Sequence, residues 1–571
     1  MFRNTNKEKQ LNLFSNVRNH LTKRTMKIYE DDNEWHNQFR VQVINRIDEE
    51  LFRPLFNDNF GAPNASIRLL IGMMILKEAQ GWSDSQLFEN SQFNLLTRSA
   101  LGLFNIDDPI PAESTYYLLR RRIVDRENEG NENLIEKVFS QVTKSQVAEF
   151  KINGKKIRMD SKLLGSNIAW YSRYELIHET LVMLYKEFQL EMESLLSDWD
   201  IEILNGISCE EGKNVSYRSN KTEIESKISE LGLIIYKIIS QIKCDTSTTL
   251  QTLRRVFEEQ YQLIEDVVIA RPKQEIIATS VQSPHDTDCH YRKKGDNQVK
   301  GYSINITETC ERENKPDLIT SVIVKGASAA DCDFLQPAIE ATREITQNPI
   351  ETVNADGAYH SESNQDYCQE NTIDLIVSAI SGKAPRYDLE VDQNNELIVI
   401  DTKNNEVVTT RRVETRKEDA QPKWAILTEN NKYRYFTQKE IDTCILRKQI
   451  AARTAKELNL RNNVEASIFQ LGYHYPNDKS RYRGLIKHKI WANVRCMWVN
   501  FVRIYKFLAS PSPNCVQTEP NGAQNVKNRL FLPQILLEYG KLWLNISQIK
   551  IFSYQLPQNS FKNGFMKNYF L

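Results

Sequence analysis

The spacing of apolar residues predicts an all-helical region near the N-terminus. Between residues 66 and 125, apolar side chains recur at the three- and four-residue intervals of helices that face a core. Gly81 separates two of these helices, and the Asp-Asp-Pro-Ile-Pro run at 107–111 precedes the last one, which ends in Arg120, Arg121 and Arg122. Short helices, tight turns and a terminal arginine cluster are typical of a helix-turn-helix DNA-binding module, although a plain helical bundle gives the same pattern.

A sheet is predicted after this region. Residues 155–160 alternate in polarity as a short strand does, and that strand ends in Asp160 before a polar turn. Further elements are predicted as strands at 298–306, 318–324, 350–356 and 373–380, with an amphipathic helix at 331–345. The strand at 350–356 also ends in an aspartate, Asp356. This order predicts an α/β fold with a mixed sheet flanked by helices.

Two segments interrupt the sheet pattern. Residues 174–269 carry helical stripes, and 384–437 hold short β-type runs separated by pairs of asparagines, as in a small β-hairpin insertion. A helical pattern resumes at 438–459. The domains expected are therefore a helical N-terminal DNA-binding domain at 1–135, a sheet core at 136–169, 284–383 and 438–508, a helical insertion at 170–283, a β insertion at 384–437 and a C-terminal tail at 509–571.

Composition narrows the classes of protein that the chain can be. Charged residues make up 26% of it, and no apolar run reaches the ~18 residues of a membrane span, so we expect a cytoplasmic protein that contacts no membrane. The nine cysteines never form a Cys-x-x-Cys pair, which favours reduced thiols. His285, Cys289, His290 and Cys310 are the nearest approach to a zinc cluster, but their spacing fits no closed structural site.

The net charge of −1 does not indicate a nucleic-acid partner, but the distribution of charge does. Residues 479–506 contain no acidic side chain and interleave aromatic residues with cations. The cations are Lys479, Arg481, Arg483, Lys487, Lys489, Arg495, Arg503 and Lys506. This pattern is expected of a surface that faces phosphates, and equally of a solvated helix face with counter-charges elsewhere in the fold.

Two aspartates are candidates for metal chemistry. Asp160 and Asp356 each end a predicted strand, and ligands of open α/β sheets gather at that edge. Carboxylates that meet there repel one another unless a divalent cation such as Mg²⁺ neutralises them. A third carboxylate on a nearby helix would complete a two-metal site. Any single acid is more often an ordinary solvent-facing residue than a ligand.

Four motifs, taken in order, resemble the DDE transposases of bacterial insertion sequences, a family with an RNase H-like catalytic core. They are 158–169 (Arg-Met-Asp-Ser-Lys-Leu-Leu-Gly-Ser-Asn-Ile-Ala), 286–302 (with Asp286, Asp288, Arg292 and Lys300-Gly301-Tyr302), 355–361 (Ala-Asp-Gly-Ala-Tyr-His-Ser) and 461–465 (Arg-Asn-Asn-Val-Glu). Residues 68–122 also resemble the helical domain that precedes this core. The resemblance covers roughly residues 35–508, and it implies that the strand bearing Asp160 is the central first strand of the core.

The resemblance implies specific roles. Asp160, Asp356 and Glu465 would hold two Mg²⁺ or Mn²⁺ ions per active site, and Arg461 would lie near the DNA phosphate. Glu440 and Glu457 are the nearest alternatives to Glu465, which is favoured by the apolar stripe beside it. The activity implied is cleavage of transposon ends and joining of their 3′ ends to target DNA. The partners implied are double-stranded DNA and a second copy of the chain in a synaptic complex.

This sequence departs from the family's Tyr-(2)-Arg-(3)-Glu-(6)-Lys signature at both ends. Leu458 stands in place of the tyrosine and Gly472 in place of the lysine. Phosphate contacts would then fall to other cations, for which Arg481, Arg483 and Lys487 are candidates. An RNase H-like nuclease without strand transfer and a catalytically inactive, transposase-derived DNA-binding protein are the alternatives. The inactive DNA-binding protein is disfavoured because all three acidic positions are filled.

Overall fold

The computed structural model describes residues 1–5, 14–242, 246–311, 314–379, 385–392, 396–413, 423–428 and 430–510. The tail expected at 509–571 therefore lies outside the described residues from 511 onward. Within the described ranges, no helix is long and apolar enough to cross a membrane.

The N-terminal region is helical, which confirms the prediction from apolar spacing. Its helices are α1 (Lys23–Glu30), α2 (Trp35–Gln42), α3 (Ile67–Gln80), α4 (Asp84–Phe93), α5 (Leu95–Ala100), α6 (Glu113–Asn128) and α7 (Leu134–Glu149). Gly81 ends α3 with a left-handed φ of 69°, a conformation that favours glycine. Ser83 and Gln86 then form a reciprocal capping box that starts α4.

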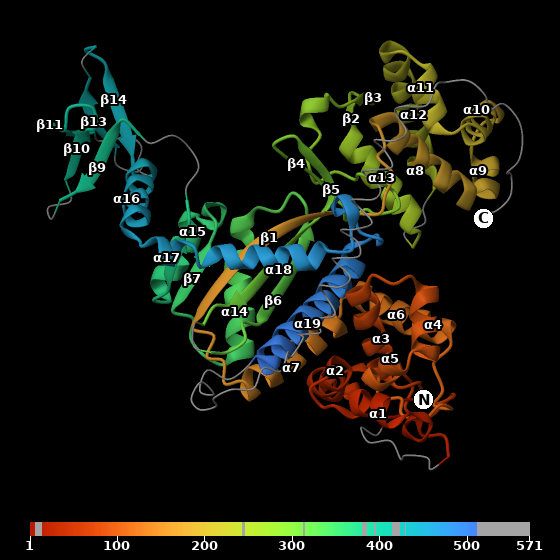
Figure 1. Ribbon diagram of the computed structural model, residues 1–571. Coiled ribbons are helices and arrows are strands. Elements are labelled where there is room, and N and C mark those ends of the chain that lie inside the picture. Colours follow the sequence, from red (N-terminus) through yellow and green to blue (C-terminus); the bar gives the residue numbers. More distant parts are fainter. Residues whose placement is uncertain are drawn as a thin grey trace, which may run out of the picture. The chain divides into compact units, whose positions relative to one another are not determined.

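A six-stranded mixed sheet forms the centre of the fold (Figure 1), which confirms the predicted α/β class. Its strands are β1 (Lys156–Gly165), β4 (His290–Lys294), β5 (Asn297–Thr309), β6 (Ile319–Gly326), β7 (Thr352–Ala355) and β8 (Asp374–Val377). β1 lies between β5, to which it is antiparallel, and β7, to which it is parallel. β6 pairs antiparallel with β5, β4 pairs with the start of β5, and β8 pairs parallel with β7.

The strand that carries Asp160 is longer than the sequence predicts. We expected it to end at Asp160, but β1 continues to Gly165. The extension is paired along its whole length with β5, from Asp160 opposite Ile306 to Gly165 opposite Gly301. The polar residues after Asp160 remain in the strand because a long partner satisfies their backbone groups, which local polarity cannot reveal.

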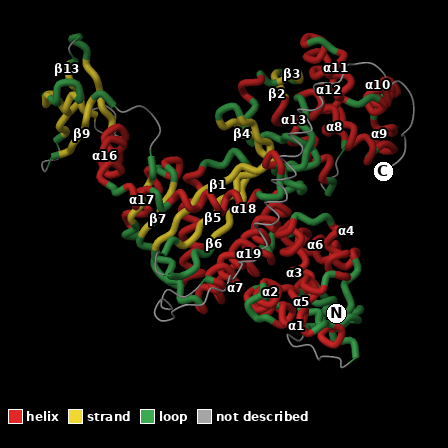
Figure 2. The backbone as a smooth tube through the Cα atoms, viewed as in Figure 1, coloured by secondary structure: helices red, strands yellow, loops and turns green. Residues whose placement is uncertain are grey.

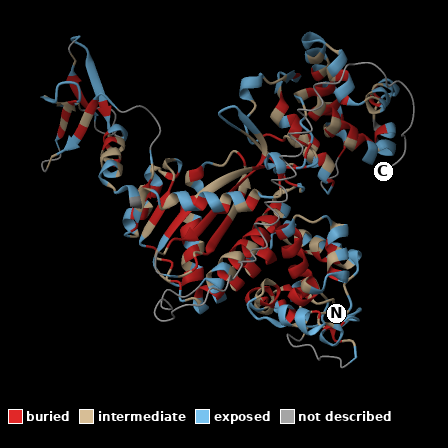
Figure 3. Cartoon of the chain, viewed as in Figure 1, coloured by how far each residue is buried: buried red, intermediate tan, exposed pale blue. Residues whose placement is uncertain are grey.

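Helices cover both faces of the sheet, and Figure 3 shows buried residues along the strands and along α19 (Leu485–Ala509). On one face, Ile157 and Met159 of β1 pack with residues of α14 (Leu335–Thr346) and α15 (Glu362–Glu370). On the other face, Ile304 of β5 belongs to a core that also contains residues of α3, α7 and α19. The N-terminal helices and the sheet therefore share one hydrophobic core.

The helical insertion has its own core and ends differently from the prediction. Its helices are α8 (Arg173–Glu187), α9 (Gln189–Leu195), α10 (Asp198–Cys209), α11 (Gly212–Arg218), α12 (Lys221–Gln241) and α13 (Thr248–Gln260). We expected helix as far as residue 269, but β2 (Tyr261–Ile264) and β3 (Val267–Ala270) form a hairpin there. Glu265 and Asp266 make the turn with φ values of 49° and 61°, and the β-branched residues that follow favour a strand.

The second insertion consists of two three-stranded sheets (Figure 2). One contains β9 (Tyr387–Val391), β10 (Leu397–Asp401) and β11 (Glu406–Val408), and the other contains β12 (Arg411–Val413), β13 (Lys423–Leu427) and β14 (Tyr433–Thr437). The helix predicted from residue 438 is α16 (Gln438–Ala452), followed by α17 (Ala455–Leu458) and α18 (Val464–Gly472). Ile441 of α16 packs with Trp424 and Phe436, so α16 belongs to the core of this insertion.

A buried histidine joins α19 to the sheet. His488 donates from Nδ1 to the carbonyl oxygen of Gly484 at 2.8 Å, and its Nε2 lies 2.7 Å from the hydroxyl of Ser480. Its ring packs on Tyr302 of β5, with 4.2 Å between ring centroids. Burial lowers the pKa of His488 to about 4, against the opposing effects of the Gly484 carbonyl and Asp286.

Acidification is therefore expected to destabilise the fold through His488. An unfolded histidine titrates near pH 6.5, whereas the folded side chain titrates near 4. Between these values the unfolded state binds a proton that the folded state does not, so the free energy of unfolding falls as pH falls, by about 2 kcal/mol at pH 5. Urea unfolding near pH 7.5 and near pH 5 measures this change. His488→Asn, which does not titrate, should show a weaker pH dependence, and an equal one would contradict the assignment.

Candidate active site

The two predicted aspartates lie side by side because of the register between two parallel strands. β1 and β7 pair from Lys156 opposite Thr352 to Arg158 opposite Asn354. Continuing this register by two residues places Asp160 beside Asp356, the residue that follows β7. Asp356 also accepts a hydrogen bond on Oδ1 from the Gly357 backbone N–H at 2.6 Å, which starts a short 3₁₀ turn.

Arg461 lies close to all three predicted carboxylates, those of Asp160, Asp356 and Glu465. Its Nη2 lies 3.0 Å from Asp160 Oδ2 and 3.6 Å from Asp356 Oδ2, and its Nη1 lies 4.0 Å from Glu465 Oε1. Arg461 follows α17 in a short turn, and Glu465 is in the first turn of α18. The side chain of Asp160 is 16% exposed and that of Glu465 is 65% exposed. The alternatives have other positions: Glu440 caps α16 and Glu457 caps α17.

A buried ion-pair network holds α18 against the sheet. Glu308 of β5 is fully buried and accepts hydrogen bonds from Arg158 of β1 at 2.5 Å and from Arg503 of α19 at 2.7 Å. Ser467, in the middle of α18, donates its hydroxyl to Glu308 at 2.6 Å. Burial alone would raise the pKa of Glu308, but the two arginines hold it below its usual value. The network fixes the helix that carries Glu465 relative to the strand that carries Asp160.

Asp160 is in a less polar environment than an ordinary aspartate. Burial raises the pKa of its carboxyl group, and the neighbouring Asp356 adds to this effect. Arg461 and the Ser161 backbone N–H oppose the shift without cancelling it. Ionisation of the Asp160 carboxyl group therefore costs free energy, which a nearby positive charge would offset.

The donor set fits a divalent cation in kind. Carboxylate oxygens are the hard ligands that Mg²⁺ and Mn²⁺ prefer, and one guanidinium within 4.0 Å of all three acids shows that a single positive group can reach them. In their present orientations, no three His, Cys, Asp or Glu side chains of the described residues could hold a metal ion. Metal binding by Asp160, Asp356 and Glu465 would therefore require a change in the orientation of their side chains.

The residues of the other motifs have structural positions. Asp286 is buried, accepts a hydrogen bond from the Tyr302 hydroxyl at 2.5 Å and also accepts one from Ser166, so it ties β5 to the end of β1. Tyr359 is 1% exposed and its hydroxyl accepts a hydrogen bond from Asn305 at 2.7 Å. Ser361 caps α15. These side chains position the strands around the acids.

Lys162 occupies the space beside Gly472, where the family signature has a lysine. A Cβ atom at Gly472 would lie 2.7 Å from Cε and 3.1 Å from Nζ of Lys162. Lys162 is two residues after Asp160 on β1, so both side chains point to the same face of the sheet. Its ammonium group forms an ion pair with Asp478 at 2.6 Å. A cation is thus present near this position, supplied by a different segment of the chain.

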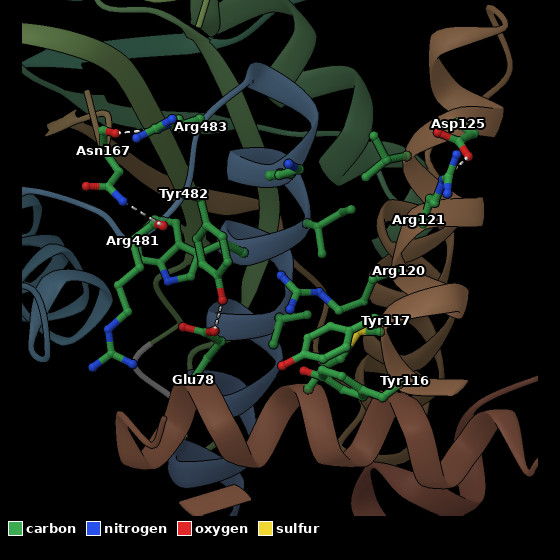
Figure 4. Close-up of a pocket in the computed structure, with 16 residues that line it drawn as sticks. Glu78, Tyr116, Tyr117, Arg120, Arg121, Asp125, Asn167, Arg481, Tyr482 and Arg483 are labelled. Atoms are coloured by element: carbon green, nitrogen blue, oxygen red, sulfur yellow. Dashed lines mark hydrogen bonds and ion pairs between the residues drawn. The ribbon is translucent and has the colours of Figure 1, made fainter. Parts of the chain in front are cut away.

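The basic residues singled out in the sequence divide into two groups. Arg120 and Arg121 of α6 and Arg481, Arg483 and Lys487, just before and at the start of α19, line one cleft (Figure 4).

The others, apart from the exposed Lys506, have partners within the fold. Arg122 lies over the ring of Phe56, Lys479 donates to the Ile168 carbonyl at 3.0 Å, and Lys489 pairs with Glu127 at 2.8 Å. Arg495 and Arg503 of α19 donate to groups inside the core.

Three charged residues near the site do not stand out in the sequence. Glu308 and Arg158 are ordinary members of alternating strands until their pairing is known, and Lys162 lies in the polar run after Asp160. A signal for Glu308 exists, because a carboxylate near the end of a strand, within a run of buried residues, needs a partner. Its partners come from β1 and α19, which the sequence alone does not identify.

Comparison with known proteins gives one match. Residues 28–122 match the family model described as Transposase domain (DUF772), which spans the helices from the end of α1 to Arg122 in α6. Searches of the curated proteins and of the solved structures gave no significant match. The N-terminal region thus carries a transposase domain, and its match points to transposase activity and to DNA as a partner.

Proposed function

We propose that this protein is a DDE transposase that cleaves phosphodiester bonds at transposon ends and joins the freed 3′ ends to target DNA. The observation that carries the proposal is the convergence of Asp160, Asp356 and Glu465 around Arg461. These residues come from three segments separated by more than 100 positions in the sequence. The Transposase domain match at residues 28–122 supports the same function from a separate part of the chain.

The arrangement of the sheet supports an RNase H-like core. β1, β5 and β6 form consecutive antiparallel pairs, and β7 and β8 add in parallel on the other side of β1. The first strand of the core is therefore central, as the proposal requires. Asp160 lies on that central strand and Asp356 immediately follows the neighbouring strand, so the acids lie at one edge of the parallel part of the sheet.

The chain's own residues can bind and orient a phosphodiester at this site. Two Mg²⁺ or Mn²⁺ ions, held by Asp160, Asp356 and Glu465, would activate the attacking oxygen and stabilise the leaving oxygen. Arg461 can donate two N–H groups to a phosphate. Within the described residues, its buried Nε has no hydrogen-bond partner. No covalent intermediate on the protein is needed, because water and then the freed 3′-hydroxyl are the attacking groups. In agreement, Tyr359 is buried and Ser361 caps a helix.

A strand cleavage and joining assay tests the function. The full chain is incubated with supercoiled DNA that carries the ends of its own element, with Mg²⁺ or Mn²⁺, and in parallel with a chelator. We expect cleavage at the ends and covalent joining to a second DNA, both lost on chelation. Joining needs two ends in one complex, so we also expect a dimer on DNA. Cleavage that persists in the chelator would overturn the metal-dependent mechanism.

The alternatives give different outcomes in the same assay. An RNase H-like nuclease would cleave in a metal-dependent manner without joining the 3′ ends. A catalytically inactive DNA-binding protein would bind the ends and do neither. The presence of all three acids at one site favours an active enzyme over the inactive protein.

A further inference from the structure

A cleft of about 580 Å³ lies where α6 meets the segment that leads into α19 (Figure 4). Five of its lining side chains are cationic, and two are acidic. The cations are Arg120, Arg121, Arg481, Arg483 and Lys487, and the acids are Glu78 and Asp125. The cations come from two segments that are some 360 positions apart in the sequence, so folding alone brings them together.

Most of the positive charge in the cleft has no counter-charge beside it. Arg481 and Arg483 donate to backbone carbonyls, Arg481 to Trp82 at 2.9 Å and Arg483 to Asn167 at 2.6 Å, so these bonds orient the guanidinium groups without neutralising them. Arg120 lies 5.5 Å from the ring centroid of Tyr482. Lys487 is exposed and, among the described residues, forms no ion pair.

The two acids cancel only part of this charge, since five cations against two carboxylates leave a net formal charge of about +3. Glu78 accepts a hydrogen bond from the hydroxyl of Tyr482 (Figure 4). It also accepts one from the hydroxyl of Tyr475, which lies outside the cleft lining. Asp125 pairs with Arg121 at 3.4 Å, and both of these side chains are more than half exposed, so the pair is weak. The cleft therefore retains a net positive potential.

A buried donor in the cleft has no acceptor. Trp491 lines the cleft and is 1% exposed, and within the described residues its indole Nε1 has no hydrogen-bond partner. A tryptophan N–H that is removed from water normally finds an acceptor. The cations around it are matched by a ligand rich in acceptor oxygens, and phosphate oxygens are such acceptors.

The cleft is connected to the acids by the strand that carries Asp160. β1 continues from Asp160 to Gly165, and Asn167 then lines the cleft. The connection is held by backbone hydrogen bonds, from Ser480 to Gly165 at 2.8 Å and from Asn167 to Tyr482 at 2.9 Å. At about 3.3 Å per residue, the path from Asp160 to Asn167 is roughly 20 Å long. Along duplex DNA this is about six base pairs.

We propose that this cleft binds backbone phosphates of duplex DNA about six base pairs from the bond that is cut at the acids. This inference rests on the proposed function and adds to it the surface that fixes the DNA relative to Asp160. The N-terminal helix α6 and the start of α19 then bind one DNA backbone together. The contact recognises phosphate and carries no sequence preference of its own.

The first test measures binding of a 30-base-pair duplex of arbitrary sequence by fluorescence anisotropy over a range of salt. The double variant Arg121→Gln/Lys487→Gln removes two exposed cations that make no contact within the core. For this variant, the slope of log K against log salt concentration is expected to be shallower by about 1.8. Its affinity for the duplex at about 0.1 M salt is expected to be roughly 60-fold lower. Arg122→Gln is the matched control, because Arg122 is on the same helix but lies over Phe56. Equal salt slopes in wild type and the double variant would overturn the proposal, and so would an equal loss in the control.

The second test places the contact relative to the cut. The cleavage assay is repeated with a series of duplexes, each of which carries one neutral methylphosphonate in place of a phosphate at a different position. We expect roughly tenfold slower cleavage by wild type when it is about six base pairs from the cut, and little effect there on the double variant. Cleavage that is insensitive at this distance would overturn the cleft's role and leave the proposed function intact. Absence of any metal-dependent cleavage would overturn the proposed function itself.

Discussion

Replacing Asp356 with asparagine is expected to slow DNA cleavage by roughly 10³-fold or more, because a metal site supplies several kcal/mol of transition-state stabilisation and each 1.36 kcal/mol is a factor of ten. Asparagine has the same size and retains an oxygen that can accept the Gly357 N–H, so the turn after β7 should form normally. Asp160→Asn should give a similar loss. Rates are measured as end cleavage with Mg²⁺ and again with Mn²⁺.

Asp374→Asn is the matched control for this prediction. Asp374 begins β8, the strand next to β7, and pairs with Arg453 at 2.6 Å on the surface. Asp374 carries the same charge as Asp356 and lies in the same sheet, but it is outside the group of acids around Arg461. The Asp374→Asn variant should cleave DNA at a rate within about twofold of wild type. The exposed ion pair that it loses contributes at most about 1 kcal/mol to stability. If Asp356→Asn cleaves as well as the control, the site is assigned to the wrong residues.

Glu308→Ala is expected to lower the free energy of unfolding by about 3–5 kcal/mol, because it leaves buried positive charge without a partner. Arg158 is 5% exposed and Arg503 is 18% exposed, and both donate to Glu308. Ser467 loses its acceptor as well. Chemical denaturation of the purified chain measures the change. Glu344→Ala, at an exposed position on α14, should stay within about 0.5 kcal/mol of wild type.

Glu308→Gln separates the effect of charge from that of volume. Glutamine fills the same space and can still accept one hydrogen bond, so its loss of stability should be smaller than that of Glu308→Ala. Because Glu308 also fixes α18, both variants should lower cleavage even at temperatures where they are folded. A fully stable Glu308→Ala protein would show that the arginines have other partners, for example Asp317, which Arg158 already contacts at 3.0 Å.

The sequence predicts those parts of the fold that depend on local pattern. The helices of the N-terminal region, the strands around Asp160 and Asp356 and the two insertions follow from the spacing of apolar residues and from turn residues. The true end of β1 at Gly165 does not, because residues 161–165 are held in the strand by β5, more than 130 positions away. The β2–β3 hairpin was likewise predicted as helix, since its short apolar runs fit either period.

The candidate site shows the same division. Asp160 and Asp356 are expected together from their strand ends, and Glu465 from the family resemblance; the structure places all three around Arg461. The parts that the sequence does not reveal depend on contacts between distant segments: the Glu308 network, and the ammonium group of Lys162 beside Gly472. Arg120 and Arg481 were predicted as separate basic groups, and only the packing of α6 near the start of α19 shows that they line one cleft.

The core shared by the N-terminal helices and the sheet has a consequence for how such proteins can evolve. The matched family region ends at Arg122, yet residues of α3, such as Ile75, belong to the same hydrophobic core as Trp491 and Phe501 of α19. A gene fragment that encodes only the matched region would leave these apolar surfaces in water. We therefore expect the matched region to be unstable when it is separated from α19. We expect chimaeric chains to fold only when the N-terminal helices and α19 come from the same parent.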